Sequence, residues 1–420
     1  MKAPMKAALA ATAALTLLVT GCAAGGSPTD GGDEKIVLNM WGFADLSAPL
    51  VAQYEAEHPN IDIQSKISDY DAAHQTLLTS LIAGQGPDVA QIAVDYMGEF
   101  VDNSGAFNDL RDYGAEDIAG DYLDWRWKTG VASDGSVVAI PTDVGGMAIA
   151  YRKDLFQQAG LPTDRAEVAA LWPDWDGYIE TGKKYVGATG KSFVDAGKAI
   201  YRAASNQADE KYYDADGNLI YEDNPAIKQA WDYSMQAVEA DLSADLSTWS
   251  PEWLAGMSNG AFATIPAPAW LLSTIKQQAP DTEGVWDVAT LPGVVGNDGG
   301  SFLAVPKASK HPQEAYDFIS WLEAPEQQLA LFQDNRTFPS TPKLYEDPAV
   351  ADLTDPFFSD APLGTIYTDS VESLNGYPIG PDSRVVEQQF EAGVGRVEQG
   401  QSPDDSWKEA LEAAARESNG

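Results

Sequence analysis

The chain has 420 residues, with 64 Asp or Glu against 26 Lys or Arg, which gives a formal net charge of −38 at pH 7. A field of this sign repels phosphate backbones and anionic lipid surfaces, so it excludes nucleic acid as a partner and favours a neutral or cationic ligand. With 44% hydrophobic residues over this length, the chain can build two domains of ordinary size.

The N-terminal segment predicts export from the cytoplasm. Lys2 and Lys6 precede an uncharged, mainly apolar stretch, residues 7–19, and small residues follow, which is the pattern of a secretory signal peptide. The stretch is shorter than the roughly 20 residues that span a bilayer. Residues 19–22 (VTGC) resemble a bacterial lipobox, which implies cleavage before Cys22 and acylation of its sulfur.

Cys22 is the only cysteine in the chain. A free cysteine is usually a small buried hydrophobic residue, but a following run of Ala, Gly, Ser and Pro fits a lipid anchor better. We therefore expect residues 1–21 to be a signal peptide and residues 22–35, rich in Gly and acid, to form a flexible tether. No second cysteine is left to form a disulfide.

The first third of the mature chain alternates strands and helices. We predict strands at 36–41, 61–67 and 88–94, and helices at 46–58 and 71–83, the second of them ended by Gly84. This β-α-β-α-β order builds a parallel sheet by right-handed crossovers, with ligand sites at the carboxyl ends of the strands.

The next segment indicates a passage between two lobes. Two short apolar strands, 137–141 and 147–151, are joined by an acid and paired glycines, Thr142 to Gly146. A helix over 152–159 stops at Gly160. A later helix is expected to open at Asn224, with its Ile227, Trp231 and Met235 stripe in the core.

Four stretches of the sequence resemble, in order and spacing, the extracellular solute-binding proteins of ATP-binding cassette sugar importers. They read TLLTSLIAGQGPDVAQI, GSVVAIPTDVGGMAIAYRKDLFQQAGLP, MSNGAFATIPAPAWLLSTIKQQAPD and GGSFLAVPKASKHPQEAYDFISWLEAPEQQ. Together with their spacing they extend the resemblance over nearly all of the mature chain.

The resemblance implies a two-lobed α/β fold of the periplasmic-binding-protein type (type II). Each lobe would be a mostly parallel sheet flanked by helices, and the lobes would close as a hinge on a sugar. The implied lobes are 36–143 with 301–335, and 144–300 with 336–420, joined by crossings near 143–147, near 298–303 and after the helix at 313–324.

The same resemblance implies a receptor and not an enzyme. Its partners would be a carbohydrate and the permease subunits of an importer, and it would need no cofactor or metal. It would act as a monomer on the extracellular face of the cytoplasmic membrane or in the periplasm.

A neutral sugar needs planar hydrogen-bonding groups for its hydroxyls and flat aromatic faces for its C–H patches. Acidic and aromatic residues of these two kinds lie at or after the ends of the first three predicted strands and in the passage between the lobes. They are Trp41, Asp69, Tyr70, Asp95, Tyr96 and Asp143. Each Asp can accept two hydroxyl bonds, or it can instead cap a helix N-terminus. For Asp143, before the paired glycines, we favour a ligand contact over a structural role in the hinge.

Trp270 matches the tryptophan that commonly stacks on a sugar in the family, and Gly299 and Gly300 would let backbone amides approach the ligand. For a further set we expect either a ligand contact or an ordinary surface or core position: Asn206, Gln207, Trp249, Trp253, Trp286, Phe338 and Tyr367. Several tryptophans in both lobes favour a di- to tetrasaccharide, because each ring needs its own face.

Two alternatives remain open from the residues alone. A secreted glycosidase would also use aromatic subsites and a carboxylate pair, and a receptor of this shape could instead bind a polyol or a nucleoside. A metal site is not indicated, because His58, His74 and His311 lack ligand spacing and are expected to be solvated. The acidic stretch 214–218 predicts a turn, since its glycine is misplaced for a calcium loop.

Overall fold

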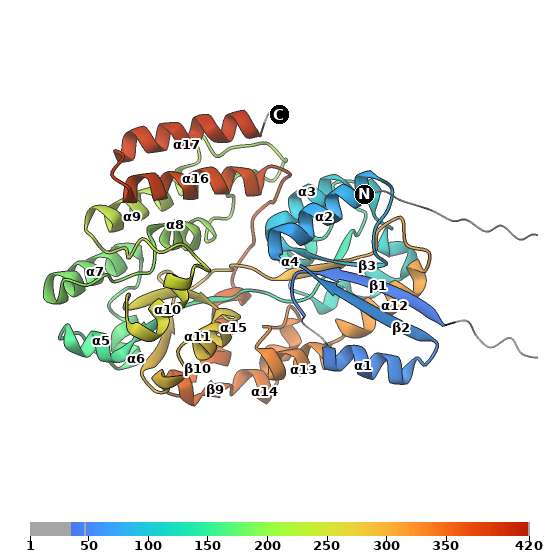
Figure 1. Cartoon of the computed structure of the whole chain (residues 1–420), viewed down its shortest axis with the longest axis horizontal. Coiled ribbons are helices and arrows are strands. Elements are labelled where there is room, and N and C mark those ends of the chain that lie inside the picture. The colour runs from blue at the N-terminus through green and yellow to red at the C-terminus, as the bar shows by residue number, and fades with distance from the viewer. Residues whose placement is uncertain (1–34, 46–47, 419–420) are drawn as a thin grey trace, which may run out of the picture.

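The computed structural model describes residues 35–45 and 48–418. It consists of two lobes lying side by side and joined by extended segments (Figure 1). We call the half built on the five-stranded sheet lobe 1, and the half built on the three-stranded sheet lobe 2. The predicted signal peptide, Cys22 and all of the tether except Lys35 lie outside the described residues.

The sheet of lobe 1 has the order β2-β1-β3-β8-β4. Its strands are β1 (Ile36–Gly42), β2 (Ile61–Ile67), β3 (Val89–Ala93), β4 (Ala139–Pro141) and β8 (Ser301–Ala304). Its helices are α1 (Ala48–Glu57), α2 (Tyr70–Ile82), α3 (Val94–Asp102), α4 (Asp124–Thr129), α12 (Pro312–Leu322) and α13 (Pro325–Asn335). One hydrophobic cluster joins the sheet to α1 and α12, and a second joins it to α2 and α3.

The sheet of lobe 2 has the order β6-β5-β7. Its strands are β5 (Met147–Arg152), β6 (Thr264–Pro268) and β7 (Trp286–Thr290), with a small pair β9 (Thr354–Asp355) and β10 (Ala361–Pro362) beside it. The first group of its helices is α5 (Lys153–Gln158), α6 (Arg165–Ala169), α7 (Trp175–Thr189), α8 (Gly197–Ser205), α9 (Pro225–Glu239), α10 (Pro251–Asn259) and α11 (Leu271–Gln278). The second group is α14 (Pro348–Ala351), α15 (Leu363–Glu372), α16 (Ser383–Glu398) and α17 (Pro403–Glu417).

Local sequence signals explain several boundaries. Gly84 follows α2 with φ +67°, a left-handed conformation that glycine adopts without strain. The side chain of Asn224 accepts the N–H of Ala226 at the start of α9, with Pro225 in the first turn. Both ends lie where the sequence predicts them. No helix of residues 35–45 and 48–418 is long and apolar enough to cross a membrane.

The two-lobed α/β fold is as predicted, but a mostly parallel sheet in each lobe is wrong for lobe 2. There the central strand β5 runs antiparallel to both β6 and β7. In lobe 1, β1 is parallel to β2 and β3, whereas β8 is antiparallel to β3 and β4. The reason is the route of the chain: β5 and β8 each enter their lobe from the other one, so they run against strands that end at the junction.

Hydrogen bonds tie the crossing segments together between the lobes. The N–H of Thr142 donates to the carbonyl of Ser301 (2.9 Å), and that of Val144 donates to the carbonyl of Phe338 (3.0 Å). The N–H of Asp298 donates to the carbonyl of Gly145 (2.8 Å). These bonds hold residues 142–145, 298–301 and 338 together between the two sheets.

Candidate functional site

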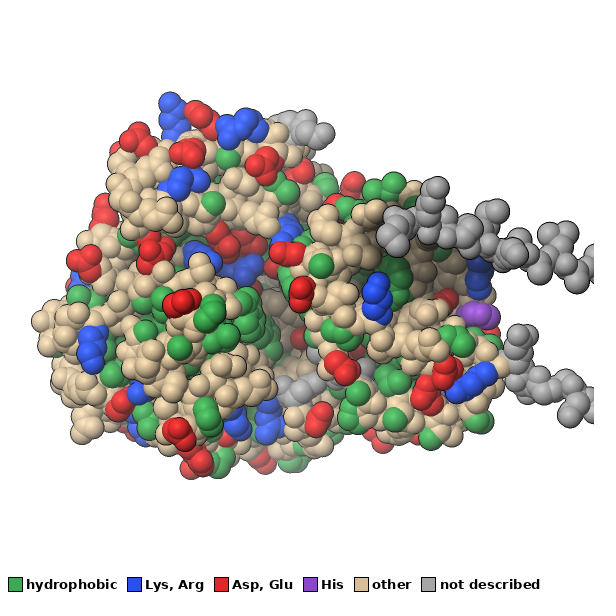
Figure 2. All heavy atoms as spheres, in the orientation of Figure 1, with side chains coloured by type: hydrophobic (Ala, Val, Ile, Leu, Met, Phe, Trp, Pro, Cys, Tyr) green, Lys and Arg blue, Asp and Glu red, His purple; other side chains and the backbone are tan. Residues whose placement is uncertain are grey.

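A hollow separates the two lobes at the surface (Figure 2). Hydrophobic side chains gather on its lobe 2 side, and acidic and basic side chains lie together above them. Because β1 to β4 end at the junction in lobe 1, and β6 and β7 end there in lobe 2, the loops after these strands border the hollow. We call this interlobe region the cleft.

The lobe 1 side of the cleft carries polar groups at strand ends. The Tyr70 hydroxyl donates to Oδ2 of Asp95 (3.2 Å). Asp69 is exposed at the N-cap position of α2, yet its side chain makes no capping bond. Trp41 is half-buried at the end of β1, with Lys66 Nζ 4.6 Å from its ring centre. The carboxylate of Asp69 is thus not used by the helix.

Tyr96 is buried and takes part in a contact between the lobes. Its hydroxyl donates to Oδ1 of Asp71 (2.8 Å), and the same oxygen pairs with Arg384 Nη2 of α16 (2.6 Å). The Arg384 guanidinium also lies 4.2 Å from the Tyr96 ring centre. These contacts place Tyr96 beneath the cleft surface.

His74 is not solvated, and the prediction is wrong on this point. It lies on the buried side of α2 with 1% exposure and stacks on Tyr96 at 3.8 Å between ring centres. Its Nδ1 lies 2.6 Å from the carbonyl of Tyr70, and its Nε2 accepts the N–H of Ala93 (2.9 Å). Both bonds fit a neutral ring with the proton on Nδ1. Burial lowers the pKa of His74 to about 4.

The carboxylate of Asp143 is hydrogen-bonded to the crossing segments. Its Oδ1 accepts the N–H of Ser301 (2.8 Å) and the hydroxyl of Thr142 (2.5 Å). The side chain is buried. This carboxyl oxygen joins the first crossing to the second, so the structure gives Asp143 the hinge role that we had ranked below a ligand contact.

Gly299 and Gly300 both have positive φ, +102° and +90°. A Cβ on Gly299 would lie 2.8 Å from Trp270 Nε1, and one on Gly300 would lie 2.2 Å from Arg126 Nη2. Glycine is therefore required here by backbone conformation and by the approach of two protein side chains.

Trp270 and Trp249 form an aromatic platform on the lobe 2 side. Their rings stack with centres 5.9 Å apart and planes 20° from parallel. Trp270 Nε1 donates to the carbonyl of Asp298 (3.0 Å), which fixes its ring beside the second crossing. Trp249 is 56% exposed and has φ +67°, an unfavourable conformation for a residue with a side chain. A strained backbone that holds a large ring in solvent is typical of a binding position.

Three other candidates are not available to a ligand. Trp253 is buried in the core of lobe 2, where its Nε1 donates to Asp195 (2.8 Å), and Phe338 is buried in the same cluster. The Asn206 amide donates to the carbonyl of Asn297 (2.9 Å) and accepts from Lys211 (2.6 Å). We assign them to structural roles. The same holds for the weaker candidates Gln207, Trp286 and Tyr367, which are bonded or buried.

A charged network at the cleft was not predicted from the sequence. Its centre is Arg202 of α8, which pairs with Asp95 of lobe 1 (3.2 Å). Arg202 also lies near Asp298 (3.7 Å), Glu387 (3.6 Å) and Glu391 (3.4 Å). These partners are far apart in the chain, so no local pattern reveals them.

The pKa values of the acids in this network shift in different directions. Burial raises the pKa of Asp298 and of Glu391. For Glu387, burial acts in the same direction but is outweighed by Lys211 and Arg202, which lower its pKa. Lys211 and Glu387 form a buried ion pair at 2.5 Å. Of these three acids, Glu387 is therefore the one whose ionised form is most strongly favoured.

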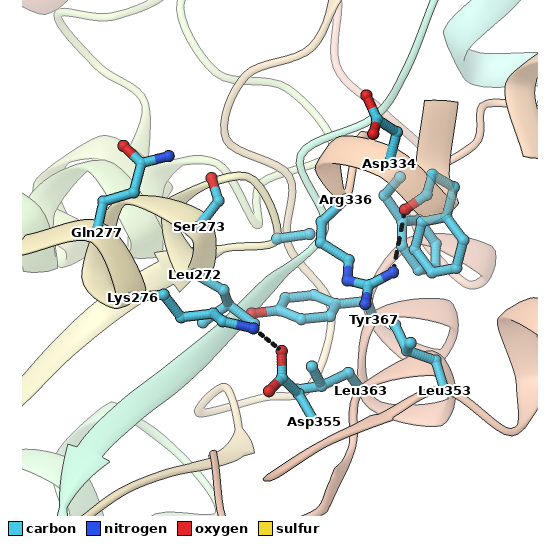
Figure 3. Close-up of a pocket in the computed structure, with 13 residues that line it drawn as sticks. Leu272, Ser273, Lys276, Gln277, Asp334, Arg336, Leu353, Asp355, Leu363 and Tyr367 are labelled. Atoms are coloured by element: carbon cyan, nitrogen blue, oxygen red, sulfur yellow. Dashed lines mark hydrogen bonds and ion pairs between the residues drawn. The ribbon is translucent and has the colours of Figure 1, made fainter. Parts of the chain in front are cut away.

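A separate cavity lies beside the third crossing (Figure 3). It has a volume of about 240 Å³ and lies between α11, α15, β9 and the end of α13. Lys276 and Asp355 form an ion pair at 2.6 Å on its wall, and Arg336 Nη1 donates to the carbonyl of Phe332 (3.3 Å). Lys276 and Asp355 thus neutralise each other on this wall. Within the described part of the chain, no three His, Cys, Asp or Glu side chains are placed to hold a metal.

Residues 49–358 match the family model of bacterial extracellular solute-binding proteins, so the chain belongs to this family. Two relatives are arabinooligosaccharide-binding proteins. The one from Halalkalibacterium halodurans is 25% identical over 72% of this chain and 69% of its own. The one from Bacillus subtilis is 26% identical over 74% of each.

A solved structure also resembles the chain closely. A crystal structure of an extracellular solute-binding protein of family 1 is 36% identical to it, with a TM-score of 0.84. The match covers 91% of this chain and 99% of that one. The agreement extends over both lobes and the crossings between them.

Proposed function

We propose that this protein is the substrate-binding component of an ATP-binding cassette sugar importer. It captures a neutral oligosaccharide of two to four rings in the cleft and delivers it to the permease without chemical change. The observation that carries the proposal is the platform of Trp249 and Trp270 in lobe 2, together with the oxygens of Tyr70 and Asp95 that follow the strands of lobe 1. Flat rings and acceptor oxygens are what a sugar ring requires.

The family and its named relatives support the ligand class.

The proposed lobes are residues 36–143 with 301–335, and 144–300 with 336–420. We further propose that Cys22 is acylated and holds a monomer at the outer face of the cytoplasmic membrane, or in the periplasm of a two-membrane cell. Mass spectrometry of the membrane fraction tests the anchor, because Cys22→Ala should abolish the lipid adduct and release the protein.

Sugar binding is tested by calorimetric titration with arabinotriose, lactose and maltotriose. A ligand that binds only the folded state also raises the melting temperature with concentration. We expect saturable binding of at least one oligosaccharide, quenching of tryptophan fluorescence, and weaker binding of its monosaccharide. Equal affinity for monosaccharide and oligosaccharide would contradict the proposed ligand size.

A glycosidase is the second candidate, because Asp298 and Glu391 both lie beside Arg202 and burial raises the pKa of each, which is the direction required of a general acid. Incubation of each bound oligosaccharide with the protein, followed by measurement of new reducing ends, separates the two functions. We expect no release over hours at a protein concentration that saturates binding. Catalytic turnover would show that the protein is an enzyme and would contradict the proposed receptor function.

A further inference from the structure

Arg202 contacts both lobes from one position. It lies on α8 in lobe 2, and its side chain keeps 31% exposure. Nη2 lies 3.2 Å from Oδ2 of Asp95, which begins the first turn of α3 in lobe 1. Nε lies 3.4 Å from Glu391 on α16 and 3.7 Å from Asp298 on the second crossing.

The acids around Arg202 outnumber the cations. Four carboxylates surround it, and one of them, Glu387, is also paired with Lys211. Among the ion pairs of the described residues, Arg202 supplies the single cation for Asp95, Asp298 and Glu391. Asp95 comes from lobe 1, and the other acids come from lobe 2 and the crossing that leaves it. Arg202 thus separates like charges that face each other across the cleft.

We propose that Arg202 is a positioning residue that couples the two lobes: its guanidinium lets Asp95 approach the lobe 2 acids, so that the cleft can close on its ligand. The proposal rests on the proposed function. Without this cation, the carboxylate of Asp95 meets three carboxylates at short range, and the closed arrangement is opposed by their repulsion. Removal of Asp95 then relieves the repulsion that removal of Arg202 creates.

A double-mutant cycle tests this coupling. The proteins are wild type, Arg202→Gln, Asp95→Asn and the double variant, titrated at low salt with whichever of arabinotriose, lactose or maltotriose binds wild type. We expect Arg202→Gln to weaken binding at least tenfold and Asp95→Asn to weaken it a few-fold. The double variant should bind more tightly than Arg202→Gln alone, which two independent losses would not produce.

Salt gives a second signature of the same mechanism. At about 1 M NaCl the screening length falls to roughly 3 Å, so the affinity of Arg202→Gln should recover towards that of wild type. Arg202→Lys, which keeps the charge, should restore most of the affinity at low salt. An additive cycle, together with a salt-independent defect in Arg202→Gln, would overturn the proposal.

The separation of the lobes can be measured without any sugar. By small-angle X-ray scattering, Arg202→Gln should have a larger radius of gyration than wild type at low salt, and Asp95→Asn or high salt should reverse the change. Arg165→Gln is the matched control, because Arg165 pairs with Asp287 inside lobe 2 at 2.6 Å. It should lower stability and leave the radius unchanged.

The scattering and binding measurements distinguish a failure of the lobe coupling from a failure of the proposed function. An unchanged radius in Arg202→Gln overturns the coupling even if sugars bind. Failure of every sugar to bind wild type contradicts the proposed function, while an increase in the radius still supports the charge coupling of the lobes.

Discussion

The two sides of the proposed binding cleft differ in chemistry. Lobe 1 presents oxygens at strand ends, those of Asp69, Tyr70 and Asp95, whereas lobe 2 presents the stacked rings of Trp249 and Trp270. Oxygens bind hydroxyls with direction, and rings bury C–H surface with little direction. The difference suggests that lobe 2 supplies most of the affinity and lobe 1 most of the selectivity, and that the full site forms only when both sides meet.

The largest effect is expected on the lobe 2 side. Trp270→Leu keeps apolar volume but removes the flat ring, and should weaken sugar binding by about 2 kcal/mol, roughly thirtyfold. Calorimetry measures the loss. The matched control is Trp172→Leu, at a tryptophan buried in a different hydrophobic cluster of lobe 2 from the one that Trp270 packs against. It should cost stability with unchanged affinity, and equal losses of affinity in both variants would contradict the platform.

The lobe 1 side should be sensitive to acid through His74. The unfolded imidazole takes up a proton near pH 6.5, while the folded one resists until about pH 4. The unfolded state therefore binds more protons in this window, and the free energy of unfolding should fall by about 2 kcal/mol between pH 7 and pH 5. Urea unfolding measures this decrease.

His74→Gln should lose that part of the pH dependence. His58→Gln, at a half-buried histidine of the same lobe, should keep it. If wild type and His74→Gln lose stability equally between pH 7 and pH 5, then His74 takes up its proton in the folded protein as readily as in the unfolded chain, and its bond from Ala93 is misassigned.

Substitution of Trp249 should change the sugar affinity and the stability of the fold in different ways. Trp249→Gly should weaken sugar binding by about 1 kcal/mol, because one ring of the platform is lost. The same change should leave the fold as stable or slightly more stable, since glycine adopts positive φ without strain. Calorimetry and thermal unfolding give the two numbers. A large loss of stability with unchanged affinity would place this ring in the core.

The smallest effect is expected at Asp69. Asp69→Asn keeps the shape and one acceptor oxygen, so affinity should fall only a few-fold, but the ranking of sugars that differ in one hydroxyl should change. Helix stability should be unaffected, because the side chain makes no capping bond. A drop in melting temperature with unchanged sugar ranking would assign Asp69 to the helix.

Much of the lobe 1 side follows from the sequence, because strand periodicity locates β1 to β3 and parallel strands bring their ends together. The lobe 2 side does not follow in this way. Arg202 meets Asp95 across 107 positions of chain, and Asp143 is held by Ser301 across 158. Trp249 combines high exposure with a positive φ. Such roles depend on contacts between residues far apart in the chain, and composition and periodicity do not reveal these contacts.

The position of β8 has a consequence for biosynthesis. This strand lies between β3 and β4, although it is made after β5, β6 and β7, the three strands of the lobe 2 sheet. A nascent chain that has emerged only to residue 300 lacks the strand that joins β4 to the rest of the first sheet. Lobe 1 can therefore reach its final strand pairing only after residue 304 has been made, whichever side of the membrane it folds on.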